Sequence, residues 1–66
     1  MNTLGDDLPR EMARCRRLLE VYKELGPVGA FGHAMIEADL RAADEAVISG
    51  DLVAMIKAYE ALKACE

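Results

Sequence analysis

The sequence predicts an all-α protein of three helices, in which a long first helix precedes two helices joined by a short turn into an antiparallel hairpin. Two observations support this fold class. Apolar residues recur at intervals of three and four along most of the chain, which is the spacing of amphipathic helices. Proline occurs only at positions 9 and 27, and glycine only at 5, 26, 29, 32 and 50, so these residues divide the chain into three helical segments.

The length and composition predict one helical domain over residues 1–66, with a flexible N-terminus at 1–6, that forms a homodimer. A chain of 66 residues buries only about 60% of the surface that its unfolded form exposes. Yet 53% of its residues are hydrophobic, and 22 of them are Leu, Ile, Val, Met, Phe or Tyr. One small core can hardly hide so many side chains, and a second subunit would cover the remainder.

The charge pattern favours a cytoplasmic protein that meets neither membranes nor nucleic acid. No run of 18 apolar residues could span a bilayer, and the polar first seven residues lack the basic and apolar parts of a secretory signal. In the cytosol, Cys15 and Cys65 would be reduced. The formal net charge of -4 would repel phosphate backbones, so nucleic-acid binding is disfavoured.

The first helix is expected over about 8–25. Asp6 or Asp7 can cap its first N–H groups, and Pro9 would then fall in the first turn, where proline is tolerated. Gly26 and Pro27 form a strong stop signal. The apolar positions have the alternating spacing of a short heptad seam, and this seam should contribute to the dimer interface. The seam consists of Leu8, Met12, Cys15, Leu19 and Tyr22.

The second helix should end near Ser49, and its start lies somewhere between Pro27 and His33. Pro27 could occupy a first helical position, or 27–32 could form an ordered loop. One apolar stripe consists of Ile36, Leu40, Ala43 and Val47. A second stripe has alanine at every fourth position from 30 to 46, and small residues let another helix approach closely. Replacing Ala38 or Ala42 with leucine is therefore expected to destabilise the fold strongly.

The third helix is expected over about 52–65. Gly50 ends the preceding helix and Asp51 caps this one, and so short a connection predicts an antiparallel hairpin. The expected apolar face consists of Leu52, Met55, Ile56, Tyr59 and Leu62. The segment from Ser49 to Leu62 resembles half of a tetratricopeptide-type hairpin, but stable arrays of such repeats need about three copies. We therefore interpret it as shared hairpin chemistry.

Two candidate ligand sites have ordinary structural alternatives. Glycines at 26, 29 and 32 suggest a phosphate loop, but no strand precedes them, and a tight helix corner filled by Phe31 is favoured. His33 and Glu37 could share a helix face with Cys65 as a third metal ligand, but a surface His–Glu pair is the favoured interpretation. No metal or cofactor is predicted. Cys15 and Cys65 are expected to behave as small core residues rather than to form a disulfide.

The remaining candidates form a predicted interaction surface. Arg10, Arg14 and Arg17 share one side of the first helix, where they could contact DNA, face solvent or meet an acidic protein surface. Tyrosines on apolar faces serve either as core residues or as interface anchors. No pocket that could shift carboxylate pKa values is expected in so small a chain, so an enzyme is not predicted. The candidate surface comprises Arg10, Arg14, Arg17, Tyr22, Glu37, Asp44, Glu45 and Tyr59.

The stretch 26–32 (Gly-Pro-Val-Gly-Ala-Phe-Gly), with Met35-Ile36-Glu37 and the later segment 49–56, resembles short helical proteins of proteobacterial genomes and temperate transposable phages. Phage quorum-sensing anti-activators, which bind and silence host regulators, are one group of comparable size. The resemblance implies a phage-type inhibitor or modulator that binds a host regulatory protein. A small DNA-associated transcriptional regulator and a structural or assembly subunit are the alternatives.

Overall fold

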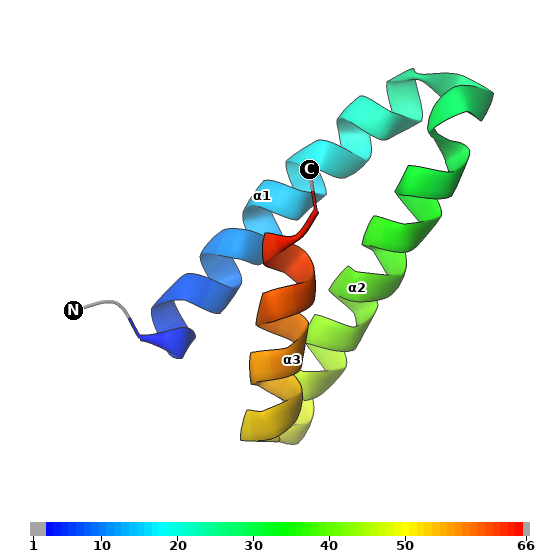
Figure 1. Cartoon of the computed structure of the whole chain (residues 1–66). Helices are drawn as coiled ribbons and strands as arrows, with labels where there is room; N and C mark the ends of the chain where they lie inside the picture. Colours follow the sequence, from blue (N-terminus) through cyan, green and yellow to red (C-terminus); the bar gives the residue numbers. More distant parts are fainter. Residues whose placement is uncertain (1–2, 66) are drawn as a thin grey trace.

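The computed structural model describes residues 3–65, and these form three α-helices and one short 3-10 helix. Helix α1 spans Leu4–Glu24, η1 spans Gly26–Gly29, α2 spans Ala30–Ser49 and α3 spans Leu52–Lys63. Figure 1 shows α3 in the angle between α1 and α2, and α3 packs against both. The expected all-α class with three helices is confirmed. None of the helices within residues 3–65 has an apolar stretch long enough to cross a bilayer.

Helix α1 begins earlier than its sequence pattern predicts. The cap is Thr3, whose hydroxyl accepts a hydrogen bond from the N–H of Asp6 at 3.2 Å, while the Asp6 carboxylate accepts one from the N–H of Thr3 at 3.4 Å. This reciprocal pair stabilises an N-terminus better than one capping side chain does. The expected caps at Asp6 or Asp7 are therefore wrong, and Pro9 lies in the second turn. Residues 1–2 of the predicted flexible segment lie outside the described residues.

The corner between α1 and α2 settles where the second helix begins. Gly26 has a φ of +66°, a left-handed conformation that side chains rarely adopt, so the predicted stop at this position is confirmed. Pro27 then lies in the first turn of η1, and α2 follows directly from Ala30. Each of the two expected alternatives is therefore correct in part. Pro27 lies in a helical turn, but this turn is a short 3-10 helix that connects α1 to α2.

Close packing at this corner depends on two glycines and on Tyr22. A Cβ at Gly29 would lie 2.2 Å from the backbone oxygen of Tyr22, and a Cβ at Gly32 would lie 2.6 Å from its ring. The expected role of these glycines in a tight corner is confirmed. Phe31, which was expected to fill the corner, is instead 78% exposed, because Tyr22 already occupies the space beside Gly32.

The connection from α2 to α3 follows the sequence prediction closely. Gly50 has a φ of +71°, and its N–H hydrogen bonds to Ala46 and Val47 close the last turn of α2. The Asp51 carboxylate accepts a hydrogen bond from the N–H of Ala54 at 3.1 Å. Helix α3 therefore starts at Leu52 and runs back beside the second half of α2 (Figure 1).

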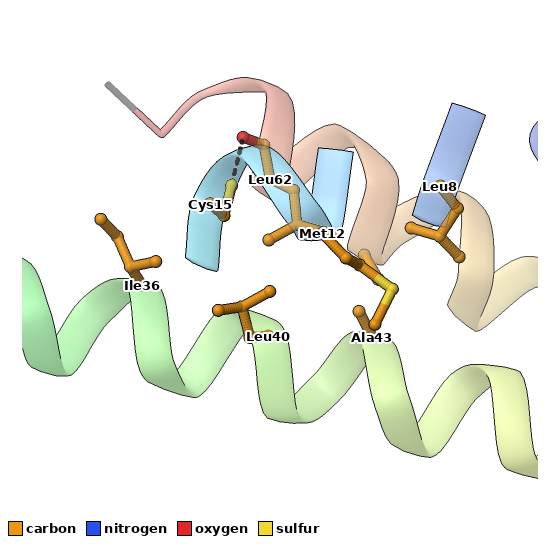
Figure 2. Close-up of a cluster of buried hydrophobic side chains, with 8 residues drawn as sticks. Leu8, Met12, Cys15, Ile36, Leu40, Ala43 and Leu62 are labelled. Atoms are coloured by element: carbon orange, nitrogen blue, oxygen red, sulfur yellow. Dashed lines mark hydrogen bonds between the residues drawn. The ribbon is translucent and has the colours of Figure 1, made fainter. Parts of the chain in front are cut away.

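The buried core lies where α1 crosses the other two helices (Figure 2). The predicted seam of α1 faces this core, since Leu8, Met12 and Cys15 are buried and Leu19 and Tyr22 are half-buried. Leu8, Met12 and Cys15 of the seam are thus covered within one chain, so any contribution of the seam to a dimer interface is limited to Leu19 and Tyr22. The main core cluster comprises Leu8, Met12, Cys15, Ile36, Leu40, Ala43, Ala58 and Leu62.

The alanine stripe of α2 faces away from this core. Alanines 30, 34, 38 and 42 are exposed, and only Ala46 of the stripe is buried. Two residues correspond to about 200° of rotation around a helix, so Ala38 points away from the core when Ile36 points into it. The expectation that Ala38 and Ala42 line a close contact within the chain is wrong, since leucine there would extend into solvent.

The Gly29→Ala substitution should destabilise the fold by about 1–3 kcal/mol, because the added Cβ collides with backbone that cannot rotate away. Urea unfolding followed by circular dichroism measures this change. Gly5→Ala is the matched control, since its Cβ would meet only the Thr3 hydroxyl at 3.6 Å and alanine favours the helix. Equal stability of the two variants would contradict the packing at the corner.

Candidate interaction surfaces

Four residues of the predicted surface, three arginines and Tyr59, line one open groove between α1 and α3. Arg10, Arg14 and Arg17 reach it from α1, together with the carboxylates of Asp7 and Glu11. Tyr59 is half-buried at its α3 side, and the Lys63 ammonium lies 5.1 Å from the centre of its ring. The structure thus brings these four candidates together, with acidic groups of the same helix among them.

Arg14 holds the end of α3 against α1. Its guanidinium donates hydrogen bonds to the carbonyl oxygens of Leu62 at 2.7 Å and Cys65 at 2.9 Å. The Glu11 carboxylate accepts a third hydrogen bond at 2.6 Å and raises the pKa of Arg14. Leu62 lies in the last turn of α3, where its carbonyl also accepts the N–H of Cys65 at 3.1 Å, and Cys65 lies just beyond the helix. Arg14 therefore adds a charged donor to two carbonyl groups at the C-terminal end of α3. Sequence spacing alone gave no sign of this role.

The other arginines of α1 differ in whether a carboxylate lies near their guanidinium groups. Arg10 is exposed and lies 3.7 Å from Asp7, and Arg16 lies 3.6 Å from Asp44 across the α1–α2 interface. Arg17 is exposed. Carboxylates within 4 Å partly neutralise the positive row, which lowers its attraction for nucleic-acid phosphates.

The predicted acidic residues lie along the outside of α2. Glu37, Asp44 and Glu45 are all exposed, and Glu37 lies 3.8 Å from Arg41 one turn later. Tyr22 is half-buried at the other end of α1, where it and Glu37 line a hollow between α1 and α2. The eight candidates therefore lie on two separate parts of the surface.

The two cysteines, 50 positions apart in sequence, meet at the end of α3. The Cys15 thiol donates to the Leu62 carbonyl oxygen at 3.5 Å (Figure 2), and the Cys65 thiol contacts the Asp39 carboxylate at 3.5 Å. The two thiols also lie close enough to hydrogen bond to each other. Burial raises the pKa of both thiols, and together with Asp39 it brings that of Cys65 to about 11. Neither cysteine is therefore activated as a nucleophile.

Among residues 3–65, ten large apolar side chains are exposed, and sequence periodicity did not identify most of them as surface residues. They lie at the two ends of α2. The corner group comprises Val21, Leu25, Val28, Phe31 and Met35. The turn group comprises Val47, Ile48, Leu52, Val53 and Ile56. Leu52 and Ile56 were expected on the buried face of α3, but that face is rotated towards Ala58 and Leu62.

Within residues 3–65, no three His, Cys, Asp or Glu side chains are placed to hold a metal ion together. No protein-family model, curated protein or solved structure matches the chain. The surface itself must therefore support any proposal about function.

The Arg14→Met substitution should lower the free energy of unfolding by about 1–2 kcal/mol, because two carbonyl groups of α3 lose a charged donor that is only about a third exposed. Arg17→Met, which removes an exposed arginine three residues later, should change stability by less than about 0.5 kcal/mol. Chemical unfolding of both variants gives the comparison. A loss at Arg17 as large as that at Arg14 would exclude a special role for Arg14.

Stability should fall as the pH rises from about 9 towards 11. In this range the unfolded chain releases the Cys65 proton, with a pKa near 9.0, while the folded chain retains it, so unfolding is favoured. The difference in stability between the wild type and Cys65→Ser, measured by urea unfolding at pH 7, 9 and 10.5, isolates this contribution. A pH-independent difference would contradict the raised pKa.

Proposed function

We propose that this chain is a small non-enzymatic interaction module that works as a homodimer and binds another protein. The supporting observation is the exposure of ten large apolar side chains within the described residues 3–65. Large exposed apolar patches rimmed by polar groups typify protein-binding surfaces. The specific form of the proposal is a phage-type modulator that occludes a host regulatory protein with a helical face.

The first turns of α3 are the part of this surface that best fits a foreign partner. Leu52 and Val53 are each 61% exposed and Ile56 is 47% exposed. Asp51 lies beside them at the start of α3, and the exposed Asp44 and Glu45 lie on the preceding helix. An apolar patch with acidic neighbours favours a partner whose apolar site has a basic rim. Charge attraction should then speed association, with an effect that salt reduces.

The Val53→Arg substitution should abolish capture of the partner, because it places a positive charge in the apolar patch without disturbing the core. The experiment is an affinity pull-down from host lysate with tagged wild type, Val53→Arg and Val21→Arg, each at low and high salt. Val21 is a matched control, since it is an exposed valine of α1 that belongs to the corner group and not to the turn group that carries Val53.

The expected result is a protein that wild type and Val21→Arg retain, that Val53→Arg loses, and that then binds the purified chain at a fixed stoichiometry. Capture of nucleic acid without any protein would overturn the proposal. Turnover of a substrate that co-purifies with the chain through every step would also overturn it.

A further inference from the structure

The chain has more surface than a compact monomer of its size. Its accessible area is 4583 Å², whereas folded monomers of this mass expose about 4,100 Å². Its radius of gyration is 12.1 Å, compared with about 10.8 Å for a compact domain of this length. The excess area is more than half of the roughly 800 Å² that each partner buries in a standard interface.

Helix α2 presents an apolar face on the side opposite the core. We call this the outer face of α2, and it comprises Phe31, Ala34, Met35, Ala38 and Ala42, all of them exposed, with the exposed Glu45 at its C-terminal end. Ile36, Leu40 and Ala43 bury the other side of the same helix. Helix α2 has 20 residues and is therefore about 30 Å long. The apolar strip from Phe31 to Ala42 covers about 17 Å of this length, and it can pair with a second helix along its axis.

We infer that the outer face of α2 is the homodimer interface, and that two copies of α2 pack antiparallel across a two-fold axis near Ala38. This inference rests on the homodimer proposed above. An isologous contact requires that residues equally far from the axis fit each other. On either side of Ala38, Ala34 faces Ala42 of the second copy, and small side chains there allow the helices to approach closely.

Exposed apolar residues near both ends of α2 also lie at equal distances in sequence from Ala38, as the two-fold axis requires. Val28 lies ten residues before Ala38 and is 87% exposed, and Ile48 lies ten residues after it and is 86% exposed. The antiparallel arrangement brings Val28 of one copy towards Ile48 of the other at both ends of the interface. Each copy thus covers an apolar end of its neighbour, which a monomer leaves in water.

Charges beside the outer face favour the antiparallel direction. Glu37 and Arg41 lie on one flank of α2, 3.8 Å apart within the chain. In an antiparallel pair, Arg41 of each copy reaches Glu37 of the other, which gives two opposite-charge contacts. In a parallel two-fold pair, the flank that carries Glu37 and Arg41 would meet the opposite flank of the second copy, so these two opposite-charge contacts would not form.

The Ala38→Arg substitution tests the interface, with sedimentation equilibrium of the purified chain at low micromolar concentration. Wild type and Val21→Arg should be dimers, and Ala38→Arg should bind itself at least tenfold more weakly. Because Ala38 is exposed in the single chain, the circular dichroism spectrum of the variant should retain its helical signal. A monomeric wild type, an undiminished Ala38→Arg dimer, or dissociation by Val21→Arg would overturn the inference.

Cross-linking tests the direction of the helices. Mixed Ala34→Cys and Ala42→Cys chains should form a disulfide-linked dimer on mild oxidation, whereas Ala34→Cys alone should not exceed the background of the wild type, which already carries two cysteines. Efficient cross-linking of Ala34→Cys alone would show a parallel pair and would contradict the inference. Self-association of the purified chain is independent of partner capture, so this inference can fail while the module still binds its partner through α3.

Discussion

Hydrogen bonds from two side chains of α1 to backbone carbonyl groups hold the C-terminal end of α3 against α1. Arg14 donates to the carbonyls of Leu62 and Cys65, and the Cys15 thiol also contacts that of Leu62. These contacts fix the position of α1 against α3. Once they form, the seam of α1 can bury Leu8 and Met12 in the same core. The hydrogen bonds from Arg14 and Cys15 and the apolar core thus lie at the same crossing of α1 and α3.

This arrangement buries one side of each helix in one small core and leaves the ends of α2 uncovered. The corner group and the turn group lie near opposite ends of α2, and the core where the helices cross covers neither of them. The surface excess is therefore a consequence of how the chain folds. It supports a function based on association, because burial of that surface is available only through another molecule.

Local chemistry made the helix boundaries at Gly26, Gly50 and Asp51 predictable, since each depends on residues adjacent in sequence. The start of α1 was mispredicted because Thr3 and Asp6 cap reciprocally, and the sequence offered several acidic caps of similar strength. Periodicity shows which residues share a face of a helix, but not towards which neighbour that face turns. For this reason the alanine stripe of α2 was assigned to the interior and Phe31 to the corner. The role of Arg14 depends on residues about 50 positions away, which no local pattern reveals.

Helix α2 is apolar on two opposite sides, and this property connects the fold to the proposed assembly. One side carries the large side chains Ile36 and Leu40 into the core, while the other carries mostly alanine, with Phe31 and Met35 near one end. Alanine contributes little apolar area by itself, so a row of it stabilises a contact mainly through the close backbone approach that it permits. In the part of the chain that the structure describes, Ala34, Ala38 and Ala42 of that row are exposed. In the proposed dimer the second α2 approaches that row, and the close helix contact that the sequence suggested would then form between two chains instead of within one.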